Sequence, residues 1–156
     1  MEYKIRKLSE CERGVLEDFL YEAIYIPEGV EAPPKNIIEQ PELQEYISEW
    51  GKEDDHCLVA EVNERIVGTV WTRIMNDYGH IDDKTPSLAI ALYKEYRGMG
   101  MGTELMKRML VVLEEKGYEK VSLSVQKENY AYKMYLKLGF EIISENEEEF
   151  IMVKQL

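Results

Sequence analysis

Residues 87–102 read SLAIALYKEYRGMGMG, and this stretch decides the fold. Its first seven residues are almost continuously apolar, which is typical of a central β-strand. Gly98, Gly100 and Gly102 follow at every second position, and a helical stripe of apolar side chains runs from Leu105 to Leu113 directly after them. The sequence therefore predicts a strand, a glycine loop and a helix that ends near Gly117.

The glycine loop indicates an anion site. Residues without a Cβ atom let backbone amides approach a ligand, and a helix N-terminus adds partial positive charge, so phosphate or pyrophosphate is the natural ligand. Two common nucleotide motifs do not fit. A dinucleotide fingerprint from Gly98 needs glycine where Thr103 stands, and a Walker loop needs lysine after Gly102. A tight turn that only joins strand to helix is the alternative interpretation.

The elements around this unit follow from apolar spacing and turn residues. Ser9 and Glu12 form the S-x-x-E pattern of a capping box, which predicts a helix that ends before Pro27. Pro41 suits the first position of a second helix. The expected strands lie near residues 3–8, 56–62, 66–71, 87–93, 121–125, 140–144 and 150–154, and the expected helices near 15–24, 41–50, 102–116 and 129–138.

This order of elements, β-α-α-β-β-β-α-β-α-β-β, predicts an α/β (α+β) fold in which helices flank a single mixed β-sheet. A chain of 156 residues is long enough to bury a core without a disulfide or metal, and domains commonly have this length. We therefore expect residues 1–156 to form a single domain.

Composition narrows the classes of function. The 31 Asp and Glu residues against 19 Lys and Arg give a formal net charge of −12, which disfavours binding to nucleic acid or to a membrane surface. Cys11 and Cys57 are the only cysteines, and no Cys/His cluster has the spacing of metal ligands, so neither a disulfide nor a metal site is expected. The N-terminal residues lack the apolar stretch of a signal peptide, which predicts a cytoplasmic protein.

Two separate motifs resemble the GNAT superfamily of acetyl-CoA-dependent N-acetyltransferases. Arg97 and the glycines after it form an R-x-x-G-x-G segment that is similar to the acyl-CoA pyrophosphate loop of this superfamily. Residues 129–140 resemble its N-x-A-x-x-x-Y-x-x-x-G-F helix and following strand. The order of elements matches over nearly the whole chain. The resemblance implies a GNAT-like acyl-CoA N-acyltransferase fold with acetyl-CoA as cosubstrate.

The resemblance also implies roles for individual residues. Loop amides would hold the pyrophosphate, the Arg97 cation would attract it, and backbone groups near residues 90–92 would bind the pantetheine arm. The Leu92 amide would stabilise oxyanion charge at the thioester. Arg97 in an ordinary surface ion pair is the alternative. The implied cofactor-binding residues are Ile90, Leu92, Arg97, Gly98, Met99, Gly100, Met101, Gly102, Thr103, Asn129 and Tyr135.

Two residues of the second motif each allow two interpretations. Asn129 caps its helix in the simpler interpretation, and the resemblance adds a polar contact to pantetheine or water. Tyr135 falls on the apolar stripe of its helix, which suits a core tyrosine whose hydroxyl is hydrogen bonded nearby. The resemblance makes Tyr135 the general acid that protonates the leaving CoA thiolate, and we favour this role.

The general base is not fixed by the sequence. A protonated amine must lose a proton before it attacks, yet the strand at residues 88–92 carries no acidic residue, unlike strands of family members that have a Glu there. His80 is the candidate best suited by its ordinary pKa, which lies near 6.5. Asp82, Glu61 and a chain of ordered water molecules are the alternatives.

The expected function is transfer of an acetyl group to an amine by direct attack in a ternary complex. The acidic residues Asp82, Asp83, Glu145 and Glu147–Glu149 suit a cationic small molecule or peptide as the acceptor. Two competing hypotheses are a non-catalytic acyl-CoA sensor, and an enzyme for O-acylation or longer acyl chains. The sequence leaves open whether the chain forms a homodimer.

Overall fold

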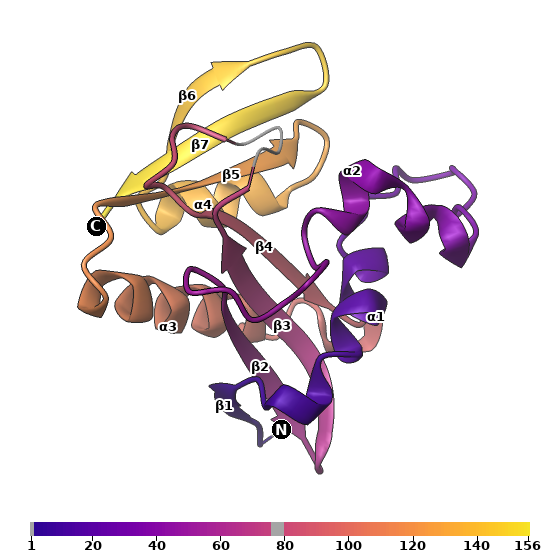
Figure 1. The fold of residues 1–156 in the computed structure, drawn as a ribbon. Coiled ribbons are helices and arrows are strands. Elements are labelled where there is room, and N and C mark those ends of the chain that lie inside the picture. The colour runs from indigo at the N-terminus through magenta and orange to yellow at the C-terminus, as the bar shows by residue number, and fades with distance from the viewer. Residues whose placement is uncertain (1, 76–79) are drawn as a thin grey trace.

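The computed structural model describes residues 2–75 and 80–156. In this part of the chain seven strands form one sheet in the order β1-β2-β3-β4-β5-β7-β6 (Figure 1). Neighbouring strands are antiparallel except β4 and β5, which are parallel, so the prediction of a single mixed sheet is confirmed. The strands are β1 (Lys4–Lys7), β2 (His56–Val62), β3 (Arg65–Arg73), β4 (Ser87–Leu92), β5 (Lys120–Gln126), β6 (Glu141–Glu145) and β7 (Glu149–Gln155).

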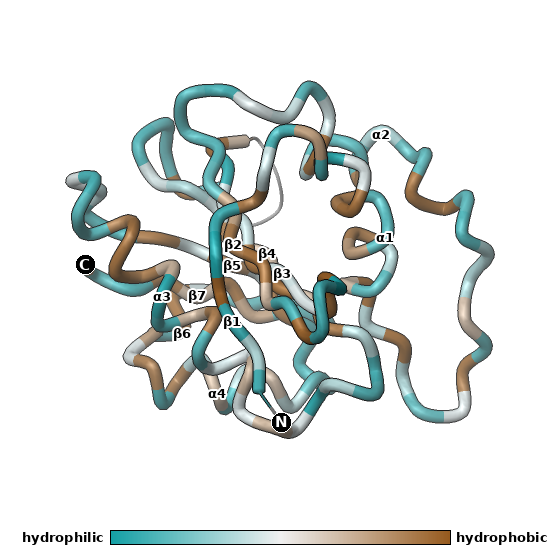
Figure 2. The backbone as a smooth tube through the Cα atoms, turned by 90° about the horizontal axis from the view of Figure 1, so that it is seen from below, coloured by the Kyte–Doolittle hydropathy of each residue, from teal (hydrophilic) through white to brown (hydrophobic). Residues whose placement is uncertain are grey.

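Helices cover both faces of the sheet. The helices α3 (Met101–Glu115) and α4 (Ala131–Lys137) pack on one face, and α1 (Val15–Glu22) and α2 (Pro41–Gln44) lie over the other (Figure 1). The segment that joins α1 to α2 loops outward from the body of the molecule (Figure 2). Short 3-10 turns at Glu10–Glu12, Lys35–Glu39 and Lys94–Tyr96 complete the element order.

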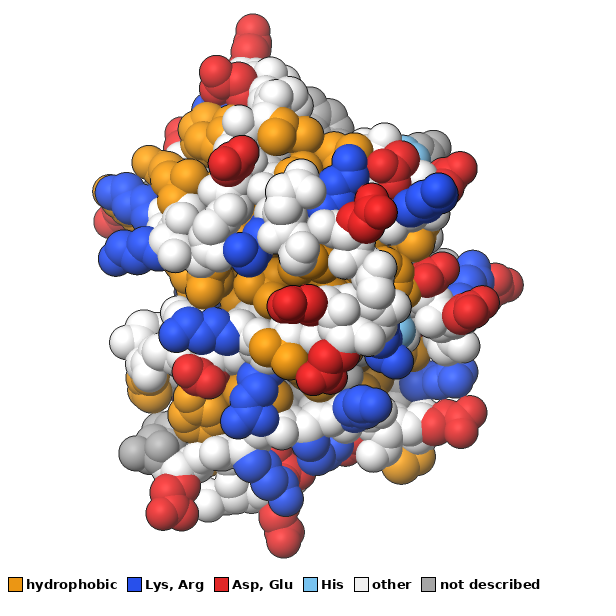
Figure 3. Space-filling model, turned by 90° about the vertical axis from the view of Figure 1, so that its left-hand side faces the viewer, with side chains coloured by type: hydrophobic (Ala, Val, Ile, Leu, Met, Phe, Trp, Pro, Cys, Tyr) orange, Lys and Arg blue, Asp and Glu red, His pale blue; other side chains and the backbone are white. Residues whose placement is uncertain are grey.

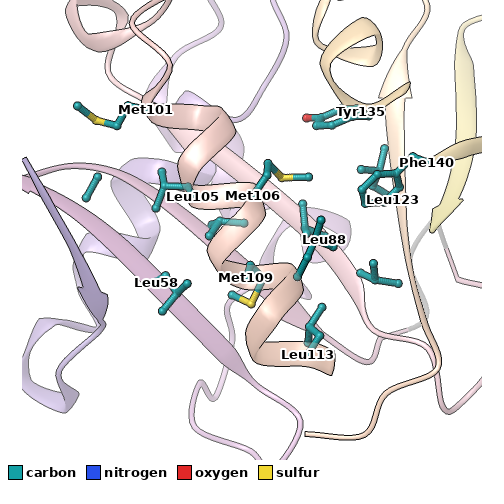
Figure 4. Close-up of a cluster of buried hydrophobic side chains, with 14 of the residues drawn as sticks. Leu58, Leu88, Met101, Leu105, Met106, Met109, Leu113, Leu123, Tyr135 and Phe140 are labelled. Carbon is teal, nitrogen blue, oxygen red and sulfur yellow. The ribbon is translucent and has the colours of Figure 1, made fainter. Parts of the chain in front are cut away.

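The main hydrophobic core lies between α3 and the sheet. The apolar residues of α3 recur at helical spacing, and Leu105, Met106 and Met109 are fully buried against strand residues such as Leu58 and Leu123 (Figure 4). Each such side chain contributes about 1.5–3 kcal/mol of hydrophobic stabilisation. This packing holds the N-terminus of α3 at the end of β4, where the glycine loop lies.

A second, smaller core lies under α1. Leu16, Phe19 and Leu20 of α1 pack on Val59 and Trp71, which belong to the adjacent strands β2 and β3. Figure 2 shows hydrophobic residues gathered along the central strands. Each face of the central sheet is therefore buried, which agrees with the continuous apolar sequence of β4.

The structure corrects the predicted helix bounds. α2 ends at Gln44 rather than Trp50, although Pro41 does occupy its first position. Glu49 and Gly51 have positive φ angles of 52° and 119°, which a helix cannot contain, so turns replace the rest of the expected helix. The Glu12 carboxylate does accept the Ser9 N–H at 2.9 Å, but this capping box closes the 3-10 turn at residues 10–12 instead of α1.

The pairing of β4 with β5 is confined to one end. Ser87 and Ser122 are the one pair in register between them, at the start of β4. Beyond this pair the sheet opens toward the carboxyl end of β4, which leads into the glycine loop. This interruption in the middle of the sheet positions the candidate site.

Surface charge is mixed on the face that Figure 3 draws, where Lys and Arg side chains are interspersed with Asp and Glu. Among the helices of residues 2–75 and 80–156, none combines the length and the apolar character needed to cross a membrane. The described residues also contain no cluster of three His, Cys, Asp or Glu side chains arranged to hold a metal ion.

Candidate active site

Backbone groups of β4 face the opening in the sheet. Leu92 lies opposite Gly68 of β3, and the Tyr93 N–H donates to the Val67 carbonyl at 3.0 Å. This bond marks Gly68 and Leu92 as a non-hydrogen-bonded pair, whose peptide groups point away from each other. The N–H groups of Leu92 and, two residues earlier, Ile90 therefore point toward β5. Because β5 is not paired with β4 at this level, these groups are available to a ligand.

The glycine loop presents a second set of amides. Gly98 and Gly100 have φ angles of 77° and 84°, which glycine adopts without steric cost, and a Cβ atom at either position would meet nothing within 4 Å. The first intrahelical bond of α3 runs from the Glu104 N–H to the Gly100 carbonyl at 3.1 Å. The N–H groups of residues 101–103 therefore have no acceptor within the helix, and they carry the positive end of the helix dipole. This arrangement fits a pyrophosphate.

Arg97 connects the loop to two other elements. Its Nε donates to the Leu92 carbonyl at 2.9 Å, and its Nη2 lies 3.4 Å from both the carbonyl and the carboxylate of Glu22 in α1. The ion pair that the sequence left as an alternative is therefore present. The side chain is still 45% exposed, and it lines the same cavity as Lys94, so both cations can attract an anionic ligand to that cavity.

A cavity of about 700 Å³ collects most of the predicted cofactor residues. It lies between the glycine loop, the end of β4, the start of α4 and the segment that follows α1. Met99 and Met101 do not line it with the others, because the Met99 side chain is exposed and that of Met101 is buried in the core. The predicted residues in its wall are Ile90, Leu92, Arg97, Gly98, Gly100, Gly102, Thr103, Asn129 and Tyr135.

Tyr135 lines this cavity from α4. Its ring packs against Phe140 with centroids 6.0 Å apart, and its phenol makes no hydrogen bond to a side chain or backbone group of the described residues. Burial raises the pKa of Tyr135 to about 12, so the phenol is protonated at neutral pH. In Figure 4 its oxygen points from α4 toward α3. A buried, protonated phenol without a partner is suited to donate a proton to a ligand.

Asn129 has the capping role that the sequence predicted. Its Oδ1 accepts the Ala131 N–H at 3.0 Å, in the first turn of α4. The side-chain oxygen is therefore engaged, while the amide nitrogen remains a donor at the cavity wall.

A second cavity of about 300 Å³ opens between β4 and β5 on the face covered by α1 and α2. It shares Ala23, Ile24, Tyr25, Ile90, Asn129 and Tyr135 with the first cavity, so the two meet between the end of α1 and the interruption of the sheet. Gln126 and Glu149 also line it, and the sequence did not single them out as site residues. Glu149 was placed only among the acidic residues that suit a cationic acceptor.

Tyr25 is a further cavity residue that the sequence did not predict. It follows α1, lines both cavities, and its hydroxyl donates to the Glu128 carbonyl at 3.1 Å. This bond joins the segment after α1 to the loop after β5, across the opening between β4 and β5. The signal in the sequence that could have indicated this role is an aromatic residue within an otherwise irregular stretch.

The candidate bases do not line either cavity. His80 contacts the Met75 carbonyl through Nδ1 at 2.9 Å and lies in the loop before β4, at the opposite end of that strand from the glycine loop. The Asp82 carboxylate accepts the Lys84 N–H and the Thr85 hydroxyl, and these bonds lower its pKa. Glu61 pairs with Lys4 at the other side of the sheet. Residues 76–79 of the predicted functional loop lie outside the described residues.

Neither cysteine offers a nucleophile at these cavities. Burial raises the pKa of the Cys57 thiol to about 12, and Cys11 is exposed near the N-terminus. Both lie outside the two cavity walls.

Sequence comparison identifies the family. The profile of the Acetyltransferase (GNAT) family matches residues 20–140, so the chain belongs to this family. The protein YyaT of Bacillus subtilis (strain 168) is 29% identical over 133 residues, which cover 85% of this chain and 83% of that protein. Acetyltransferase ECA0875 of Pectobacterium atrosepticum is 35% identical over 91 residues, which cover 57% of this chain and 60% of that protein.

Solved structures share the fold. PaiA N-acetyltransferase from Thermoplasma acidophilum, in complex with coenzyme A, superposes with a TM-score of 0.74 at 23% identity and covers 100% of both chains. YncA from Salmonella typhimurium, with its cofactor acetyl-CoA, has a TM-score of 0.71 at 15% identity and covers 100% of this chain and 95% of its own. These similarities confirm the predicted GNAT-like fold.

Proposed function

We propose that this chain is an N-acetyltransferase that moves an acetyl group from acetyl-CoA to a primary amine in a ternary complex. One observation carries the proposal: two adjacent cavities at the interrupted sheet share part of their walls, including Ile90, Asn129 and Tyr135. One cavity has the amide-rich loop that suits a pyrophosphate, and the other is free for an acceptor. A reaction between two bound substrates needs this arrangement.

The chain would hold acetyl-CoA mainly through its backbone. Amides of residues 98–103 bind the pyrophosphate, assisted by Arg97 and Lys94, and the unpaired edge of β4 hydrogen bonds to the pantetheine arm. The cosubstrate supplies an activated thioester. Its carbonyl would lie at the Leu92 N–H, which points into the opening.

Three groups then serve the transfer. The Leu92 N–H stabilises negative charge on the thioester oxygen as the amine nitrogen forms its bond to the carbonyl carbon. Tyr135 donates its phenol proton to the sulfur as the carbon–sulfur bond breaks. Water in the acceptor cavity takes the proton that the amine loses, and the Tyr135 phenolate then regains a proton from this water. His80, Asp82 and Glu61 do not line the cavity.

The proposal is tested by a panel of primary amines with acetyl-CoA, in which free CoA thiol is measured. In parallel, acetyl-CoA at a hundred times its dissociation constant should raise the free energy of unfolding by about 2.7 kcal/mol. Stabilisation without thiol release from any amine would indicate a non-catalytic acyl-CoA sensor. Release with longer acyl donors or with alcohols only would change the donor or acceptor class. Unchanged unfolding would contradict the cofactor assignment.

A further inference from the structure

The acceptor-side cavity has an uneven distribution of charge. Among the described residues in its wall, Glu149 is the one charged side chain, and Lys, Arg and His are absent from that wall. Apolar residues from α1, α2 and β4, such as Leu20, Leu43 and Leu88, make up much of the remainder. The cavity therefore offers one negative group in a wall that is otherwise uncharged and largely apolar.

The strand register locates Glu149 relative to the reaction centre. β4 and β5 are parallel with Ser87 beside Ser122, so Gln126 is level with Ala91, one residue before Leu92. Glu149 of β7 lies directly opposite Gln126 in the next pairing. Glu149 is therefore at the same height as the proposed thioester site, but on the far side of β5.

The distance across the sheet from β7 to β4 separates Glu149 from the nitrogen that would react beside Leu92. Two strand spacings of about 4.8 Å put the backbone of β7 about 10 Å from that of β4, and the opening of the sheet adds to this distance. Because side chains stand roughly perpendicular to a sheet, we expect the Glu149 carboxylate to lie over β7 and β5 rather than at the edge of β4. Gln126 lies between them, and its Nε2 donates to the Glu149 Oε1 at 3.4 Å.

From this geometry we propose that the acceptor carries two positive groups separated by an apolar spacer, and that Glu149 binds the one that does not react. The proposal rests on the proposed function, because the first amine must be acetylated beside Leu92. The apolar walls pack against the spacer, and the carboxylate forms a charge-assisted hydrogen bond with the distal ammonium. Glu149 is thus a specificity-determining residue and takes no part in bond formation.

The test compares two amines that differ only in the distal ammonium, butane-1,4-diamine and butylamine. With acetyl-CoA saturating, the wild type should favour the diamine by ~10–100-fold in kcat/KM, the range for a hydrogen bond to a charged group. In Glu149→Gln this ratio should fall to within about threefold of one, mainly through a higher KM for the diamine. Glu148→Gln is the matched control, because Glu148 is exposed and does not line the cavity, and it should keep the wild-type ratio.

Each contrary result has a distinct meaning. Equal kcat/KM for the two amines in the wild type, or a wild-type ratio in Glu149→Gln, would overturn the role of Glu149 and leave the proposed function intact. Equal losses for both amines in Glu149→Gln, with an altered pH profile of kcat, would make Glu149 a base at the reaction centre and would also overturn the proposal. No thiol release with either amine, in a protein that acetyl-CoA stabilises, would overturn the proposed function and this inference with it.

Discussion

The two sides of the interrupted sheet are built from different parts of the chain. On the proposed cofactor side the groups that would bind the ligand are mainly backbone, from the edge of β4, the glycine loop and the first turn of α3, and residues 21–32 complete the wall. The acceptor side consists of side chains from α1, α2, β5 and β7, which are far apart in sequence. A site made of backbone depends on local conformation, whereas a site made of side chains depends on how distant elements pack. Substitutions on one side should therefore change the properties of that side and leave those of the other side unchanged.

The largest effect, on the free energy of unfolding, is expected at the Arg73–Asp55 ion pair, which contacts the chain just after α2 on the acceptor side. Arg73 and Asp55 form an ion pair at 2.8 Å with both side chains nearly inaccessible, and Arg73 also donates to the Glu45 carbonyl just after α2. Asp55→Ala leaves a buried charge unpaired and should lower the free energy of unfolding by about 3–5 kcal/mol. Urea unfolding measures this loss. Asp83→Ala, at a carboxylate that is 99% exposed, should change it little.

The Arg73–Asp55 ion pair also makes the stability of the fold depend on pH. Burial opposes the charged form of Asp55, but hydrogen bonds from Arg73 and from the Lys52 and Gly51 amides hold its pKa below the ordinary value. The pair therefore stabilises the fold above the unfolded pKa of about 3.9, and this contribution is lost as pH falls through the lower folded pKa. Asp55→Ala should lack this acid-induced loss. An Asp55→Ala variant that loses stability in acid as steeply as the wild type would contradict the assignment.

The next effect concerns the cofactor side alone. Gly100→Val forces a β-branched residue into a left-handed conformation and puts a side chain where the pyrophosphate should lie. We expect it to abolish the ~2.7 kcal/mol stabilisation by excess acetyl-CoA, which is a thermal shift of about 5–10 °C. Gly117→Val is the matched control, since Gly117 has a similar φ of 86° at the other end of α3. It should lose similar stability yet keep the shift.

Tyr135→Phe tests the junction of the two cavities. It removes the phenol oxygen and keeps the ring in place, so turnover should fall by ~10²-fold while acetyl-CoA still stabilises the protein. Steady-state kcat with the best amine measures the effect. Tyr132→Phe, on the same helix with its ring against Phe150, is the control and should retain wild-type turnover. If Tyr135→Phe also turns over at the wild-type rate, Tyr135 is only a core residue.

The smallest effect is expected at the hydrogen bond from Tyr25 to the Glu128 carbonyl, which crosses the opening between β4 and β5. Tyr25→Phe removes one hydrogen bond to the Glu128 carbonyl, worth about 1 kcal/mol, and should raise the KM of acetyl-CoA or amine by a few fold. Tyr21→Phe removes a comparable bond, to the Pro33 carbonyl at 2.5 Å, that stays within the α1–α2 segment. Equal kinetics for the two variants would show that the bond across the opening has no special role.

This contrast also explains what the sequence could predict. The glycine loop, the cap at Asn129 and the hairpin of β2 and β3 depend on neighbouring residues, and all three were predicted correctly. The end of α2 was not, because the left-handed conformation of Glu49 and the Arg73 contact with Glu45 depend on tertiary packing.

The acceptor side lay beyond prediction for the same reason. Glu149 reaches its cavity only because β7 returns beside β5 in one particular register, and a shift by one residue would place it on the other face. The polar residues Ser122, Ser124 and Gln126 do alternate along β5, so one face of that strand could be inferred. Nothing in the local sequence says which distant carboxylate joins it.

The one-pair contact between β4 and β5 has a consequence for solubility. Strand edges normally occur at the margins of a sheet, where charged residues, bulges or covering loops prevent them from pairing with another chain. Here an apolar central strand has such an edge inside the sheet, at Ile90 and Leu92. A ligand that hydrogen bonds to these residues closes the edge and also prevents a foreign strand from binding there. The cosubstrate would thus protect the protein from aggregation and slow the hydrogen exchange of these two amides.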